Sequence, residues 1–104
     1  MSEPLPIHVS ALAAAQVHAA EVWWQANRPK APGAIRAELE RASPLLTLQP
    51  DIGARALNVT LPGVRRLHLG RIRYDLYYRV VDAPPRRIEI LALWHASRSS
   101  LPPI

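Results

Sequence analysis

The sequence lacks cysteine and phenylalanine, and Lys30 is its only lysine. The absence of cysteine excludes disulfides, thiolate metal sites and a thiol nucleophile, and it allows a reducing cytoplasm. No apolar run approaches the roughly 20 residues of a membrane span. The N-terminus also lacks the basic region and apolar core of a secretory signal. We therefore expect a cytoplasmic protein without a membrane segment.

Motifs for metal or nucleotide chemistry are missing as well. The four histidines, His8, His18, His68 and His95, have no ligand spacing. No glycine-rich phosphate loop and no Gly-x-Ser-x-Gly element occurs. We expect neither a cofactor nor a bound metal.

What the chain does carry is enough length for one domain and an excess of arginine. Its 104 residues, 49% of them hydrophobic, suit a single domain over residues 1–104 with one modest core. The formal net charge is +5, and arginine supplies most of the positive charge. Because arginine makes planar, bidentate contacts with carboxylates and phosphates, this indicates an acidic protein segment or a nucleic acid as partner. A GC-rich genome also favours arginine, and that alone explains part of the bias.

The first part of the chain predicts a short strand followed by a helix. Ile7 and Val9 share one face of an extended run, and Ser10 suits the N-cap of a helix from Ala11 to about Asn27. Apolar residues recur in this helix at a spacing that predicts its buried face: Leu12, Ala15, Ala19, Val22 or Trp23, and Ala26.

A second helix is expected to begin near Pro32, which suits a first turn. Its solvent face carries Glu38 and Arg41, which can pair across one turn. Pro44 would cost about 3 kcal/mol in a helix interior, so we expect a kink or an early end there. The apolar stripe of this helix is Ile35, Leu39, Ala42 and Leu46.

Three strands follow a loop, at about 64–69, 73–82 and 87–95, and their short links predict an antiparallel meander. The last strand is apolar on both faces, so we expect it inside the sheet. Two adjacent helices would cover one face of this sheet. The predicted fold is therefore α+β, a two-helix hairpin packed on one face of a small antiparallel sheet in the order β-α-α-β-β-β.

Alternation along the first hairpin divides its side chains between two faces. The helix side should take the apolar and aromatic set: Leu67, Leu69, Tyr74, Leu76, Tyr78 and Val80. The other face should then be an open patch with some cross-strand charge pairs, made of Arg66, His68, Asp75, Tyr77 and Arg79.

Three segments resemble the RelE/ParE superfamily of toxins from bacterial type II toxin–antitoxin systems. They are the hairpin GVRRLHLGRIRYDLYYRV, the closing strand IEILALWHASR and the upstream loop LLTLQPDIG, with Leu46, Pro50 and Gly53 as its pattern. The resemblance covers nearly the whole chain, from IHVS to about Arg98. It implies a compact α+β fold and a cognate antitoxin that wraps a disordered segment around the helices and the sheet edge. It also implies that operator DNA is contacted only through the antitoxin complex.

The family divides by target, and the resemblance leaves three functions open. RelE-type members are ribosome-dependent mRNA endoribonucleases, and on that interpretation Arg66, Arg79 and His95 are the catalytic residues. ParE-type members act on DNA gyrase without that constellation. The third possibility is a degenerate toxin retained as an antitoxin-binding partner.

The end of the chain favours the ParE-type interpretation. Ala96 follows His95, no aromatic residue follows Arg98, and the tail SSLPPI lacks the terminal helix of some ribonucleases. We therefore expect a ParE-like gyrase inhibitor rather than an enzyme. The residues predicted to contact a partner or target are Trp24, Arg66, His68, Arg71, Arg73, Tyr77, Arg79, His95 and Arg98.

Overall fold

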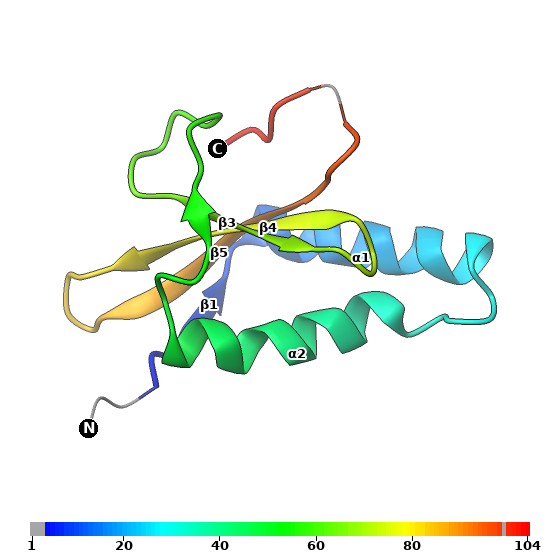
Figure 1. Cartoon of the computed structure of the whole chain (residues 1–104), viewed down its shortest axis with the longest axis horizontal. Coiled ribbons are helices and arrows are strands. Elements are labelled where there is room, and N and C mark those ends of the chain that lie inside the picture. The colour runs from blue at the N-terminus through cyan, green and yellow to red at the C-terminus, as the bar shows by residue number, and fades with distance from the viewer. Residues whose placement is uncertain (1–3, 99) are drawn as a thin grey trace.

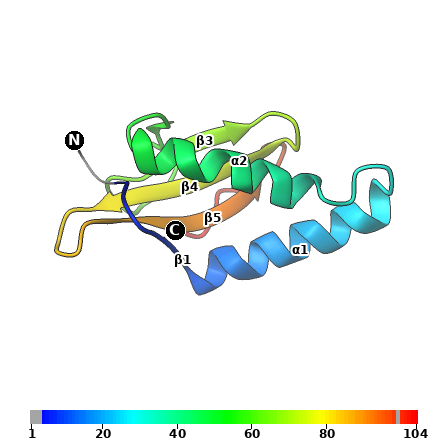
Figure 2. The ribbon, with the colours of Figure 1, turned by 90° about the horizontal axis from the view of Figure 1, so that it is seen from below.

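The computed structural model describes residues 4–98 and 100–104. Along the chain the elements are β1 (Ile7–Val9), α1 (Ala11–Asn27), α2 (Ala34–Leu48), β2 (Ala54–Arg55), β3 (Arg65–Leu69), β4 (Tyr74–Val81) and β5 (Arg87–His95). The strands form one sheet in the order β1-β5-β4-β3-β2 (Figure 1). Viewed from the helix side, α2 lies in front of β4 and α1 lies beside it (Figure 2).

The predicted α+β class and the three closing strands are confirmed. β4 pairs antiparallel with both β3 and β5, and β5 lies inside the sheet between β1 and β4. The sheet is mixed rather than wholly antiparallel, because β1 pairs with β5 in parallel. The two-residue β2 adds an edge strand beside β3 that the sequence pattern did not predict.

Helix α1 begins as predicted but buries a different face. The Ser10 hydroxyl accepts a hydrogen bond from the Ala13 N–H at 3.1 Å, which confirms the N-cap. The buried residues are Ala13 and Ala20, whereas the predicted stripe is exposed, with Val22 53% and Trp23 47% accessible. The helix is apolar around much of its circumference, so its spacing did not determine which face would pack. Small alanines on the buried face let α1 approach β5 closely.

Helix α2 runs through Pro44 to Leu48, so the predicted early end is wrong. The side chains on either side of the proline, Ala42 and Leu46, are fully buried and hold this segment on the core. Their burial outweighs the backbone hydrogen bond that proline cannot donate. Glu38 is also not on the solvent side, since it is only 3% exposed, although its predicted pairing with Arg41 is confirmed.

The face of the sheet away from the helices is covered, which corrects the predicted exposure of Tyr77 on that face. Tyr77 is 2% exposed and belongs to a second core with Ala56, Val64 and Ala92. The loop after β2 and the C-terminal tail lie over this face, opposite α2 (Figure 1). The two covering segments are tied together, because the Thr60 N–H donates to the Ile104 carbonyl oxygen at 3.1 Å.

The motif of Leu46, Pro50 and Gly53 is explained by the buried hydroxyl of Tyr78. This hydroxyl donates to the Pro50 carbonyl oxygen at 2.7 Å and accepts from the Gly53 N–H at 2.9 Å. A Cβ atom at position 53 would lie 2.8 Å from the same hydroxyl oxygen. Leu46 is fully buried and fixes the end of α2 just before this loop. The loop therefore joins the helix layer to β4 around one tyrosine, and burial raises the pKa of the Tyr78 hydroxyl.

Candidate partner-binding site

The turn between β3 and β4 holds two of the predicted site residues, Arg71 and Arg73. The backbone conformation of Arg73 is unusual. Ile72, in the middle of the turn, is 1% exposed and anchors it in the core. Arg73 has a φ of 60°, the left-handed region that glycine and asparagine normally occupy in such turns. Its carbonyl oxygen accepts from the Ala96 N–H at 2.9 Å, which ties the turn to the end of β5. Arg71 and Arg73 are left exposed on either side of the anchor.

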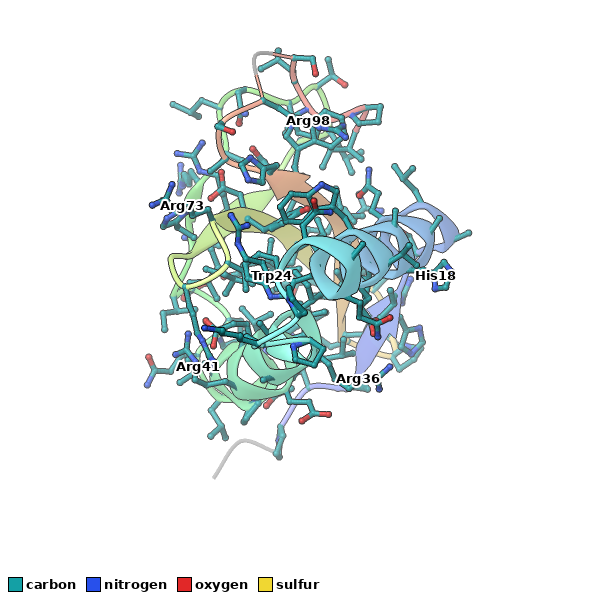
Figure 3. The ribbon with its side chains drawn as sticks, turned by 90° about the vertical axis from the view of Figure 1, so that its right-hand side faces the viewer. His18, Trp24, Arg36, Arg41, Arg73 and Arg98 are labelled. Atoms are coloured by element: carbon teal, nitrogen blue, oxygen red, sulfur yellow. The ribbon has the colours of Figure 1, made fainter. Side chains whose placement is uncertain are left out.

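A cavity of about 850 Å³ lies where this turn, the end of α1 and the end of β5 meet. Figure 3 looks onto this end of the molecule, with Trp24 between the two helices and Arg73 to one side of it. We call the cavity the arginine pocket, and its charged and aromatic lining consists of Trp23, Trp24, Arg28, His68, Arg71, Arg73 and His95. Residues from three separate segments thus converge on one concave surface.

The arginine pocket has positive charge without a compensating carboxylate. No aspartate or glutamate is among its lining residues. Within the described residues, none of Arg28, Arg71 and Arg73 forms an ion pair. Arg71 acts on a carboxylate outside the lining, Glu38, whose pKa is lowered mainly by its hydrogen bond from Arg41 and to a smaller extent by Arg71. The guanidinium groups of the pocket are therefore available to an anionic partner.

Each histidine of the arginine pocket is held by a neighbour. Nδ1 of His68 lies 2.8 Å from a carboxylate oxygen of Asp75 on β4. Nδ1 of His95 accepts from the Ser97 N–H at 3.2 Å and lies 2.6 Å from the Ser97 hydroxyl. The neutral His95 ring therefore carries its proton on Nε2. Both rings are oriented by these contacts.

The three residues predicted for RNA cleavage are divided between the two faces of the sheet. Arg66 and Arg79 lie on the face away from the helices, because their neighbours along each strand pack on the helix side. His95 lies on the helix side, where its ring packs edge-on against Tyr74 with 5.0 Å between centroids. A general acid and the cations that stabilise a phosphate must reach the same group, so this separation disfavours the three residues as one catalytic set.

Arg79 is also distant from His95 along the sheet and is occupied by an ion pair. Its Nε donates to Glu89 at 2.9 Å, and Arg87 donates to the other oxygen of the same carboxylate at 3.2 Å. These hydrogen bonds hold the pKa of Glu89 below its ordinary value despite partial burial. Arg79 lies opposite Glu89, whereas Tyr74 lies opposite His95, so about 16 Å of strand separates the two positions.

The other predicted contact residues fall into two groups. Trp24, His68, Arg71, Arg73 and His95 line the arginine pocket. Outside it, Arg66 is exposed on β3, and Arg98 stacks over the Trp94 ring with its guanidinium carbon 4.3 Å from the ring centroid. Tyr77 is buried, so the prediction of an accessible ring is wrong, and its hydroxyl accepts from the Asn58 amide at 3.1 Å.

Two residues of the arginine pocket, Trp23 and Arg28, were not predicted as site residues from the sequence. Trp23 is 47% exposed, and the guanidinium of Arg28 lies 5.5 Å from the centroid of its ring. The signal was present, since an arginine follows the Trp23–Trp24 pair by about one helical turn. The error in the buried face of α1 hid it, because Trp23 was an alternative member of the face that was predicted to be buried.

Residues 4–98 and 100–104 contain neither a metal-binding cluster nor a helix that could span a membrane. No group of three or more His, Cys, Asp or Glu side chains there is arranged to hold a metal ion. Neither α1 nor α2 has the length and apolar character that crossing a membrane requires.

Comparisons with known proteins identify one family and one similar fold. A family model described as the ParE toxin of type II toxin-antitoxin system, parDE, matches residues 7–100. A solved structure, the chromosomal ParDE TA system from P. aeruginosa, superposes with a TM-score of 0.72 at 24% sequence identity. The match covers 92% of this chain and 100% of that chain. None of the curated proteins compared with the sequence matches it significantly.

Proposed function

The chain belongs to the ParE toxin family of type II toxin–antitoxin systems, and on that premise we propose that it arrests growth by binding DNA gyrase, without chemistry of its own. A cognate antitoxin neutralises it in the cytoplasm, and operator DNA is contacted only through the antitoxin in the complex. The observation that carries this proposal is the family match over residues 7–100.

The placement of the basic residues supports action by contact over RNA cleavage. Arg79 is bonded to Glu89, and Arg66 lies on the opposite face of the sheet from His95. Residues that must act on one phosphate within hydrogen-bond distance are thus separated. The cations of the arginine pocket, by contrast, are unpaired and gathered beside exposed tryptophan, which suits recognition of a protein surface.

The exposed apolar face of α1 supports neutralisation by a wrapped antitoxin segment. Leu12, Val22 and Trp23 are 39%, 53% and 47% exposed on this helix. Val9 on the adjoining edge strand is 54% exposed. An apolar face of this kind beside an open sheet edge suits an amphipathic segment that gains order on binding.

The proposal is tested by inducing the chain without its antitoxin and following growth, plasmid supercoiling and mRNA ends in the same culture. We expect growth arrest with loss of negative supercoiling and without ribosome-dependent cleavage. In the matched variant His95→Ala the mRNA ends should be the same as in the parent. If mRNA is cut within codons and the His95→Ala variant abolishes the cuts, the chain is a ribonuclease. Full growth with a folded product would indicate a degenerate toxin.

A further inference from the structure

A second cavity adjoins the arginine pocket, because Trp23 and His95 line both, and we call the two together the groove. The second cavity, of about 270 Å³, lies between α1 and the end of β5 and shares Trp23 and His95 with the arginine pocket. Its walls include Ala19 and Leu93, and Arg98 stands at its rim. The groove therefore has a cationic end beside the β3–β4 turn and a largely apolar continuation along α1.

From this arrangement we infer that the groove binds an acidic, amphipathic peptide segment of a partner protein. Carboxylates of the segment meet Arg28, Arg71 and Arg73, and its apolar side chains lie on Trp23 and along the second cavity. The inference rests on the proposed function, because a toxin that acts by contact needs a protein-binding site, and it adds the location and chemistry of that site.

The conformation of Arg73 is an independent reason to assign it a binding role. Glycine or asparagine would take its left-handed backbone conformation with less strain. The turn itself is already held by Ile72 in the core and by the hydrogen bond from Ala96 to the Arg73 carbonyl oxygen. The fold does not need the guanidinium at this position. A strained residue with a free charged side chain at the mouth of a cavity indicates a contact with a ligand.

The apolar continuation favours a peptide over a nucleic acid. A site for single-stranded nucleic acid follows the phosphate backbone with cations along its length and stacks successive bases on aromatic rings. Here the second cavity has one arginine, Arg98, and its lining is otherwise mainly apolar or aromatic, as with Ala19 and Leu93. A segment that carries both acidic and apolar residues matches the two cavities together. All the strongly basic side chains of the groove are arginines, and arginine can form paired hydrogen bonds with the two oxygens of a glutamate or aspartate in the peptide.

One further group is consistent with an incoming oxygen atom. Trp24 is a lining residue of the arginine pocket, and its indole N–H is buried without an acceptor within the described residues. Buried donors are normally paired, so this group is satisfied only when an acceptor enters. Reaching it takes a side-chain movement in the pocket wall, which binding of a segment beside Trp23 would provide.

The test measures peptide binding to the purified full chain by fluorescence anisotropy. The probe is a fluorescein-labelled peptide of alternating glutamate and leucine, compared with peptides in which glutamine replaces glutamate or serine replaces leucine. A labelled oligo-dT strand is the nucleic-acid probe. The binding variant is Arg71→Gln with Arg73→Asn, because asparagine accepts the left-handed conformation. The control variant is Arg55→Gln, an exposed cation without an ion pair that lies opposite Arg65, about 13 Å along β3 from Leu69.

We expect the glutamate–leucine peptide to bind best and the double variant to weaken it about tenfold or more, since each lost charge-assisted hydrogen bond weakens binding severalfold. The Arg55→Gln variant should bind as the parent does. The inference is overturned if glutamine or serine peptides bind equally well, if oligo-dT binds more tightly, or if the two variants lose affinity equally. The peptide-binding assay contains no gyrase, so it tests the groove separately from the proposed function. A chain that binds the peptide but does not inhibit gyrase would contradict only the proposed function.

Discussion

Removing the Tyr78 hydroxyl should destabilise the protein measurably, because this one group joins the loop after α2 to the sheet. In Tyr78→Phe the Gly53 N–H loses its acceptor and the Pro50 carbonyl oxygen loses its donor. The Tyr78 ring is fully buried, so phenylalanine keeps the packing and only the hydrogen bonds change. The effect on the free energy of unfolding then reports these bonds alone.

The expected loss follows from the burial of the two partners. Gly53 is buried and Pro50 is half-buried, so one N–H is left fully unsatisfied and one carbonyl oxygen in part. Leaving a buried polar group without a partner costs about 1–3 kcal/mol. We therefore expect the free energy of unfolding to fall by about 2 kcal/mol. For a domain of this size that corresponds to a decrease in Tm of roughly 8–12 °C.

Urea unfolding followed by circular dichroism measures this difference in the free energy of unfolding. An unchanged slope of that free energy against urea concentration shows that the unfolded state is unaffected. The matched control is Tyr74→Phe, since the Tyr74 hydroxyl makes no hydrogen bond within the described residues. That variant should stay within about 0.5 kcal/mol of the parent. Equal stabilities for Tyr78→Phe and Tyr74→Phe would refute the account of the loop.

The remaining predictions concern charge and backbone strain. Glu89 has a lowered pKa in the folded chain, so its contribution is complete above its unfolded pKa and is lost as the pH falls through the folded value. Glu89→Gln should therefore flatten the decline in stability between about pH 5 and pH 2 in acid titration followed by circular dichroism; an unaltered decline would contradict this. Arg73→Gly relieves left-handed strain at some cost in chain entropy. The free energy of unfolding should therefore rise by about 0.5–1 kcal/mol and Tm by a few degrees, while the acidic peptide binds less tightly. A fall in Tm would show that the Arg73 side chain supports the fold.

Much of the sheet could be predicted because strand alternation is a local property. The positions of β3, β4 and β5 follow from runs of alternating residues broken by Gly70 and by the prolines at 84–85. Alternation also assigned Leu69, Leu76 and Tyr78 correctly to the helix side. It could not show what covers the other face. Tyr77 was assigned to the correct face but is buried, because the loop after β2 and the C-terminal tail form a second core there.

The two helices show where periodicity stops being informative. α1 is apolar on more than one face, so spacing alone could not separate the face that packs on β5 from the exposed face that contains Val22 and Trp23. α2 has one clear stripe, and its Ile35, Ala42 and Leu46 are buried as predicted. The effect of Pro44 was overestimated because the sequence does not show how strongly Ala42 and Leu46 hold the surrounding turns.

The candidate site could be predicted in composition but not in grouping. His68, Arg71, Arg73 and His95 were selected as basic residues of the hairpin and the closing strand, and the fold brings them together. Their meeting point with Trp23 and Arg28 depends on where α1 ends relative to the β3–β4 turn, which is a tertiary property. Arg66 and Arg79 looked equivalent to them in sequence, but neither lines the pocket, because both lie farther along their strands from the β3–β4 turn.

The most direct test of the central claim is supercoiling of a relaxed plasmid by purified gyrase, with increasing amounts of the purified chain. We predict that the folded chain abolishes supercoiling and that it does not cleave mRNA on translating ribosomes. Full gyrase activity in an excess of folded chain, together with mRNA cleavage that requires His95, would contradict the account.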